Sequence, residues 1–203
     1  LQSDSGEEPI VFLVFLAVGL YLVYSGLQKW QQMRLIQDTP TEQVQSVAAG
    51  RTALRGDARP AAGTVDRPFS DGEALYVDWT VEEYSESDGS GDWVSIDGGE
   101  SARPFDLDDG TGEIHVAAST DTVWELSTET ETVRTVDGDE TAPPEVRSFL
   151  DGRPDGASAT SADPRRYTET ALPPGEEVYV FGSAVTRDTD GDGSHRLVVE
   201  RDD

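Results

Sequence analysis

The stretch EALYVDWTVEEY, residues 73–84, is the clearest strand signal in this chain. Its apolar side chains occupy every second position, as expected for a β-strand with one buried face: Leu75, Val77, Trp79 and Val81. A turn rich in Gly, Ser and Asp follows at residues 85–92, and Trp93 to Ile96 then resumes the strand pattern. The two segments together predict a β-hairpin.

Further strand patterns lie on both sides of this hairpin. We expect a strand at residues 51–58, a hairpin of 105–107 with 113–118, one or two β segments in 122–136, and a final pair at 177–187 and 194–201. Two short helices are also expected. One covers residues 41–49 after Pro40, and the other runs from Pro144 to Leu150 and stops at Gly152.

One apolar run precedes all of these elements. It extends from Ile10 to Tyr24 and continues through Ser25 and Gly26 to Leu27, about 18 residues or roughly 27 Å of helix, enough to cross a lipid bilayer. We therefore predict a tail at residues 1–9, a transmembrane helix with its extension at 10–34, and a β-rich domain at 35–203. The expected fold class is mainly β (α+β): one N-terminal transmembrane helix, then a predominantly antiparallel β domain with two or three short helices.

The basic residues around the apolar run predict its orientation. Asp4, Glu7 and Glu8 precede the run, and Lys29 and Arg34 follow it. By the positive-inside rule, the β-rich domain should face the cytoplasm, held to the cell membrane by residues 10–27. A cleaved signal peptide is the alternative interpretation of the same run.

The chain is strongly acidic, with 41 Asp and Glu against 15 Lys and Arg and a formal net charge of -26. Such an excess destabilises a compact state in dilute buffer but is screened in molar salt, so we predict a protein of a salt-rich, halophilic cell interior. A disordered acidic chain is the alternative, although the four Trp, six Tyr and six Phe argue against it. The negative charge also argues against nucleic acid as a partner.

Cysteine is absent, and the chain has two histidines, His115 and His195. Disulfides, thiol nucleophiles and cysteine-based zinc or iron–sulfur sites are therefore excluded within this sequence.

Four short blocks occur in a suggestive order. They are Thr39–Thr41, Gly50 with Leu54–Gly56, Pro68 to Tyr76, and Arg103–Leu107 followed by residues 112–116. Together they resemble the GIDE domain, the membrane-side domain of mitochondrial E3 ubiquitin ligases. The resemblance covers roughly residues 35–200 and implies a β-rich interaction or regulatory domain.

The resemblance does not extend to ligase activity. The ligases of that family carry a zinc-binding RING after this domain, and a RING needs cysteine or clustered histidine ligands. This sequence contains no cysteine. We therefore expect no RING in it and no catalytic residue taken over from the family.

The segment Asp188-Thr-Asp-Gly-Asp-Gly193 matches the start of an EF-hand calcium loop. Asp188, Asp190 and Asp192 are the candidate metal ligands, and calcium is the one cofactor considered. Position 12 of the loop is Val199 rather than Glu, however, so an acidic hairpin turn is the competing interpretation.

A second acidic group surrounds the turn at residues 108–112. Asp106, Asp108 and Asp109 with His115 could serve a metal-dependent hydrolase, whereas Asp-Asp-Gly is also ordinary turn chemistry. His195 is expected on the surface. No nucleophile elbow, phosphate-binding loop or dinucleotide fingerprint occurs.

These observations favour a membrane-anchored, non-catalytic binding or regulatory module with an unidentified protein partner. A metal-dependent hydrolase or calcium-binding domain is the alternative, and a partner of membrane proteases or assembly factors is a third class.

Overall fold

The computed structural model describes residues 41–87, 90–127, 130–153, 157–158, 160–189 and 194–201. Nearly all of them belong to one compact unit, Glu42–Asp203. Its elements are η1 (Val44–Ser46, a 3-10 turn), β1 (Gly50–Pro60), β2 (Val65–Asp66), β3 (Glu73–Ala74), β4 (Tyr76–Ser87), β5 (Ser90–Ala102), β6 (Phe105–Asp108), β7 (Glu113–Val116), β8 (Glu131–Val136), α2 (Pro144–Asp151), β9 (Arg165–Leu172), β10 (Glu177–Thr189) and β11 (Ser194–Glu200).

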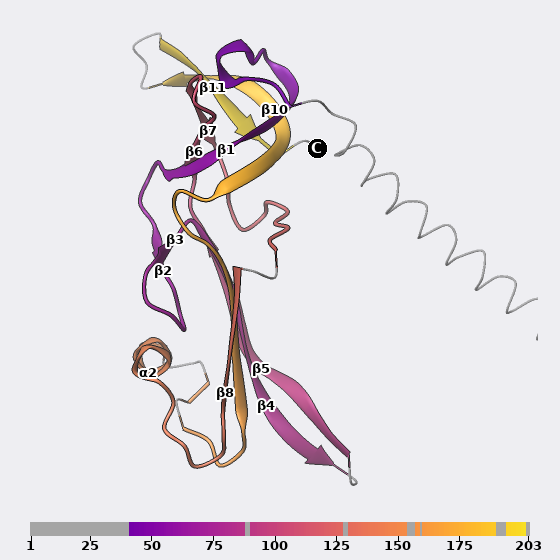
Figure 1. Ribbon diagram of the computed structural model, residues 1–203, viewed down its shortest axis with the longest axis vertical. Helices are drawn as coiled ribbons and strands as arrows, with labels where there is room; N and C mark the ends of the chain where they lie inside the picture. Colours follow the sequence, from indigo (N-terminus) through magenta and orange to yellow (C-terminus); the bar gives the residue numbers. More distant parts are fainter. Residues whose placement is uncertain are drawn as a thin grey trace, which may run out of the picture. The chain divides into compact units, whose positions relative to one another are not determined.

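Five of the strands close into a barrel in the order β1-β10-β11-β7-β6 (Figure 1). Neighbouring strands are antiparallel except β11 and β7, which run parallel where Val198 and Val199 face His115 and Val116. Leu54 and Leu107 are fully buried inside the barrel. A closed barrel has no free strand edge, so all five strands are paired on both sides.

Two glycines allow the barrel strands to approach closely. A Cβ atom on Gly182 would lie 2.4 Å from the carbonyl oxygen of Glu200, and one on Gly56 would lie 2.5 Å from that of Asp108. No larger residue fits such a distance without a backbone shift. Glycine at these positions therefore permits the tight curvature of the barrel.

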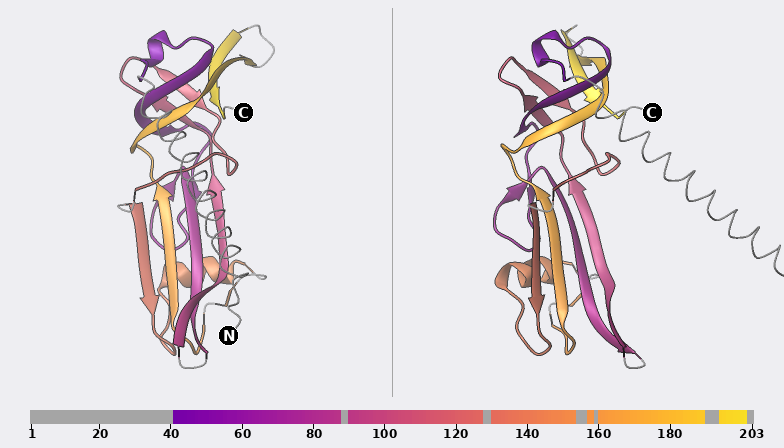
Figure 2. Two further views of the ribbon diagram at one scale, coloured as in Figure 1. Left: turned by 90° about the vertical axis from the view of Figure 1, so that its right-hand side faces the viewer. Right: turned by 45° about the vertical axis from the view of Figure 1, so that its right-hand side comes forward.

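The other large sheet has four strands in the order β5-β4-β9-β8 and extends from one end of the barrel (Figures 1 and 2). Helix α2 and the β2–β3 segment cover one of its faces. Beneath them, Phe69 lies edge-on to Trp79 and Tyr167, with ring centroids 5.8 and 5.4 Å apart. Edge-to-face aromatic pairs add about 0.5–1.5 kcal/mol each beyond the area they bury.

A charged residue is buried under the same cover. Glu169 of β9 is fully buried, and its carboxylate accepts hydrogen bonds from Arg67 Nε at 3.0 Å and Nη2 at 2.6 Å and from the Phe69 backbone N–H at 2.8 Å. A carboxylate is tolerated in such a place only when it is paired and hydrogen-bonded. The interaction holds the loop between β2 and β3 against the sheet.

The sheet and the barrel share part of one core. Leu75, Tyr76 and Leu172 belong to the barrel's hydrophobic cluster. The backbone N–H of Leu75 donates to the Leu172 carbonyl at 2.8 Å, and that of Arg103 donates to the Leu75 carbonyl at 2.8 Å. The barrel ends of β4 and β9 are thereby fixed.

The strand predictions agree with the structure at several points. The hairpins β4–β5, β6–β7 and β10–β11, the strand β1 and the helix at Pro144–Asp151 all form where the sequence patterns predict them. The predicted helix at 41–49 is wrong, because this segment contains only the 3-10 turn η1. Strand β9 has no counterpart among the predicted elements.

The predicted fold class also needs correction. The described residues are mostly β and contain one α-helix, α2, instead of two or three. No helix in this described part is long and apolar enough to cross a membrane. The transmembrane helix predicted at residues 10–34 lies outside the described residues, so the structure gives it no support.

Candidate functional site

The face of the four-stranded sheet that is turned away from α2 is the candidate site. Alternation along β4 sends Val77, Trp79 and Val81 toward α2 and leaves Asp78, Thr80 and Glu82 on the other side. Strand register extends this second surface across the sheet. We call it the open face, and its residues are Asp78, Thr80, Glu82, Tyr84, Trp93, Ser95, Gly98, Glu100, Glu131, Val133, Thr135, Arg166, Thr168 and Thr170.

An arginine and two aromatic rings form a fixed group on the open face. Arg166 donates two hydrogen bonds to Glu82, Nε to Oε2 at 2.7 Å and Nη2 to Oε1 at 2.9 Å, and its guanidinium lies 4.7 Å from the centroid of Trp93. Tyr84 meets Trp93 edge-on at 5.4 Å. The hydrogen bonds from Arg166 hold the pKa of Glu82 below its usual range. All four side chains are thus arranged before any ligand arrives.

A second aromatic pair lies where the open face meets the barrel. Trp124, from the segment after β7, stacks on Tyr76 with centroids 4.3 Å apart, and its indole N–H donates to the Ser119 carbonyl at 3.1 Å. The Tyr76 hydroxyl lies 3.3 Å from a carboxylate oxygen of Glu100. Burial, followed by the nearby charges of Asp78 and Glu100, raises the pKa of Tyr76 to about 12. Tyr76 therefore stays neutral, and its hydroxyl donates a hydrogen bond to the Glu100 carboxylate.

Asp78 and Glu100 face each other across strands β4 and β5. Loss of hydration and the nearby Glu100 carboxylate raise the pKa of Asp78. Like charges directly opposite one another destabilise a sheet, so this pair is a local cost to the fold.

The acidic turn predicted as a possible hydrolase site is occupied by structural contacts. Asp108 forms an ion pair with Arg59 at 2.6 Å, and Asp106 lies 2.9 Å from His115 Nδ1 on the neighbouring strand. Asp109 accepts hydrogen bonds from the Val44 N–H at 2.9 Å and the Thr111 hydroxyl at 2.7 Å. Burial raises the pKa of Asp109, but these and other hydrogen bonds outweigh burial and leave it lowered.

The candidate calcium ligands fall at the limit of the described structure. Asp190 and Asp192 lie outside the described residues. Asp188 is the second-last residue of β10 and is paired with His195 of β11, and the structure describes only the backbone of these two residues. Among the described residues, no three His, Asp or Glu side chains gather in a way that could hold a metal ion.

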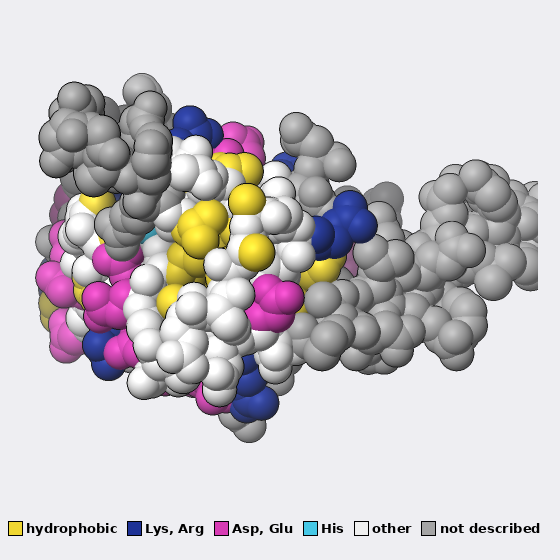
Figure 3. Space-filling view, turned by 90° about the horizontal axis from the view of Figure 1, so that it is seen from above, with side chains coloured by type: hydrophobic (Ala, Val, Ile, Leu, Met, Phe, Trp, Pro, Cys, Tyr) yellow, Lys and Arg dark blue, Asp and Glu magenta, His cyan; other side chains and the backbone are white. Residues whose placement is uncertain are grey.

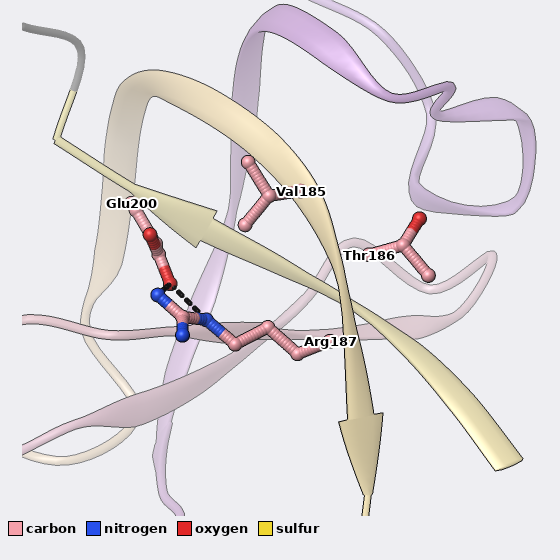
Figure 4. Close-up of a pocket in the computed structure, with 4 residues that line it drawn as sticks. All are labelled: Val185, Thr186, Arg187 and Glu200. Atoms are coloured by element: carbon pink, nitrogen blue, oxygen red, sulfur yellow. Dashed lines mark hydrogen bonds and ion pairs between the residues drawn. The ribbon is translucent and has the colours of Figure 1, made fainter. Parts of the chain in front are cut away.

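One shallow, open hollow lies on the barrel. It is lined by Val185, Thr186 and Arg187 of β10 and by Glu200 of β11 (Figure 4). Arg187 is paired with Glu200 across the two strands, so the charges in the hollow neutralise each other. Figure 3, a view of the barrel end, shows a small group of hydrophobic side chains bordered mainly by uncharged ones, with acidic and basic side chains farther out. The described residues of the hollow form no group of fixed aromatic and charged side chains like the one on the open face, so the open face is the stronger candidate site.

Comparisons of this chain with family models, with curated proteins and with solved structures find no match.

The patterns used above did not identify the residues of the open face. The hairpin prediction places Trp93 close to Tyr84, so this aromatic pair could have been found from the sequence. Arg166 could not, because its strand was not predicted and its partner Glu82 is 84 residues away.

Proposed function

We propose that this protein is a non-catalytic binding module that contacts a protein partner through the open face. One observation carries the proposal: Trp93, Tyr84 and Arg166 form a prearranged group on an exposed sheet surface. Trp, Tyr and Arg are the residue types that dominate binding energy at protein interfaces.

The geometry of this group favours binding because its side chains are already held in one arrangement in the unbound protein. Arg166 is held at one end by two hydrogen bonds to Glu82 and across its plane by Trp93. A side chain that is already fixed loses less conformational entropy when a partner arrives. The free energy of its contacts is then available for association.

The sheet beneath the open face is also well supported. Its opposite face packs on the aromatic cluster under α2, and its barrel end is anchored through Leu75 and Leu172. The resemblance to the GIDE domain supports the same proposal, because it implies an interaction or regulatory role without ligase chemistry.

Site-specific photocrosslinking in the native cell tests this function. A photoreactive residue at Ser95, an exposed position next to Trp93 on the open face, should give an adduct of discrete mass. The same residue at Thr186, an exposed position on the barrel, is the matched control and should not.

The change Trp93→Ala, added to the Ser95 crosslinker, should remove the adduct. An adduct that survives Trp93→Ala, or that forms equally from Thr186, would contradict a binding site on the open face. No discrete adduct from Ser95 would contradict the binding function itself.

A further inference from the structure

The four-stranded sheet has two edge strands, β5 and β8, and they differ in how they are protected. The pairing of β5 with β4 is interrupted by a bulge at Val81/Glu82. The Asp97 side chain of β5 also accepts a hydrogen bond from the Ala157 backbone N–H at 2.9 Å and lies 3.4 Å from Arg153, so the segment after α2 is tied to this edge. Bulges and covering segments are devices that prevent another strand from pairing.

Among the described residues, no bulge interrupts strand β8 and no covering segment is hydrogen-bonded through its backbone to its outer edge. Its register with β9 runs without a bulge from Glu131 to Val136, and its sequence ETVRTV contains no Pro, Gly or Lys. Thr and Val have high β propensity, and Val133 is 51% exposed. An edge of this kind is a template for strand addition.

The outer side of β8 is also free of backbone partners within the described residues. Its one strand neighbour is β9, and no other described segment forms a backbone hydrogen bond with residues 131–136. Figure 2 shows β8 at the margin of the sheet, with the other three strands on one side of it. Every second residue of such a strand directs its N–H and C=O groups outward.

We propose that β8 receives an extended, basic segment of a partner protein as a fifth strand of this sheet. The proposal rests on the proposed function and specifies the chemistry of the partner. Main-chain hydrogen bonds would supply affinity, and side chains at alternate positions would supply specificity.

Charge indicates the composition of the added segment. Glu131 lies within β8, and Asp137 and Glu140 follow it, against the single positive charge of Arg134. The whole chain carries a formal charge of -26. Lys or Arg in the partner would complement this edge, and opposite charges at a docking surface favour both encounter and correct pairing.

The same charges disfavour a second copy of this chain as the occupant. Antiparallel pairing of two β8 edges centred on Val133 would bring Glu131 of each copy toward the acidic end of the other, near Asp137. Like charges across strands destabilise pairing.

The added strand would lie beside the open face. Thr135 of β8 is registered with Arg166 of β9, and Val133 lies on the same surface two residues before it. Apolar β-branched side chains of the partner can therefore pack on Val133 while neighbouring residues approach Arg166.

The probe for this proposal is a synthetic peptide of alternating Val and Lys, added to the full chain and followed by backbone amide NMR. We expect amide shifts concentrated on residues 131–136 and slower hydrogen exchange there. The same peptide with backbone N-methyl groups at alternate residues keeps its charge but loses main-chain donors. It should bind at least about tenfold more weakly, a difference of about 1.4 kcal/mol.

Matched variants separate the two edges. Val133→Lys should weaken binding of the peptide about tenfold, since it places a positive charge on the proposed docking edge. Val94→Lys makes the same change on β5 at a residue of nearly equal exposure, 48%, and should leave binding unchanged.

Three results would overturn strand addition at β8: equal binding of the N-methylated peptide, shifts spread over the acidic surface, or equal loss with Val94→Lys. A dimer that Val133→Lys dissociates would overturn the choice of partner. If the Ser95 adduct persists while the peptide fails, only the inference about β8 falls. If Ser95 gives no adduct in the protein that keeps Trp93, the proposed function falls as well.

Discussion

The barrel closes on itself, whereas no described segment covers the open face of the four-stranded sheet or pairs with the outer edge of β8. The barrel achieves closure with glycines at its tightest contacts, Gly56 and Gly182, and carries ion pairs on its surface. The sheet places a charged residue, Glu169, beneath its covered face and a prearranged aromatic group on its open one. Under the proposed function, the barrel would support the sheet, and the sheet would contact the partner.

Breaking the buried charge pair should have the largest effect on the sheet. Glu169→Ala leaves Arg67 and the Phe69 N–H without their acceptor and should lower the free energy of unfolding by about 3–5 kcal/mol. Urea unfolding in molar KCl, followed by tryptophan fluorescence, measures this change.

An exposed pair on the barrel is the control for Glu169→Ala. Glu177 is paired with Arg55, and both side chains are more than half exposed. Glu177→Ala should therefore cost only about 0–1 kcal/mol. If Glu169→Ala and Glu177→Ala lowered the free energy of unfolding equally, burial would not explain the stability that an ion pair contributes in either region.

A smaller effect is expected from filling the barrel's closest contact. Gly182→Ala sets a methyl group against the Glu200 carbonyl at 2.4 Å and should cost about 1–3 kcal/mol through backbone displacement. Thermal unfolding of the full chain gives the value.

The sheet offers a matched position for this change. A Cβ atom on Gly98 of β5 would meet its nearest neighbour, the Trp79 carbonyl oxygen, at 3.2 Å. Gly98→Ala should change the free energy of unfolding by less than about 1 kcal/mol. A larger loss of stability from Gly98→Ala than from Gly182→Ala would indicate that the barrel backbone adjusts to the added methyl group more readily than the sheet.

The smallest expected effect is a gain in stability on the open face. Asp78→Asn removes the like-charge pair with Glu100 and should stabilise the chain by about 0.2–1 kcal/mol at neutral pH. On the barrel, Glu113→Gln removes an exposed ion pair with Arg59 and should bring no gain. Urea unfolding at the lowest KCl concentration that keeps the chain folded measures both.

The gain from Asp78→Asn should depend on pH in a defined direction. Because the pKa of Asp78 is raised in the folded state, the folded chain binds this proton more readily than the unfolded chain. The stability of the unmodified protein therefore gains as pH falls through that pKa, and the advantage of the variant shrinks. An advantage that grows in acid would contradict the assignment.

Much of the fold follows from local sequence patterns. The β4–β5 hairpin was predictable because one strand face is apolar and a Gly/Ser/Asp turn separates the strands. Helix α2 was predictable from its two prolines and from Gly152.

Strand β9 was not predictable, for a physical reason. Its buried face alternates Arg165, Tyr167, Glu169 and Ala171, so two of its four inward side chains are charged. These charges are acceptable inside only because Glu83 and Arg67 meet them from segments far along the chain. The sequence of β9 alone does not indicate these partners. The position of Arg166 on the open face was missed for the same reason.

The helix expected at residues 41–49 fails through another distant contact. The Asp109 carboxylate, 65 residues away, accepts the Val44 N–H, and Val44 and Val47 pack against the barrel core. These tertiary interactions replace the helical hydrogen bonds that the local sequence favours.

The order in which the strands appear along the chain has a consequence for protein synthesis. All four strands of the four-stranded sheet have been translated once the ribosome passes Leu172, whereas the barrel still lacks β10 and β11, residues 177–200. Because nascent segments begin to fold before translation ends, the sheet can assemble while the barrel is still a β1, β6 and β7 fragment with exposed edges. The last two strands then act as the closing step, and a ribosome stalled before them would present an open half-barrel to the chaperones of the cell.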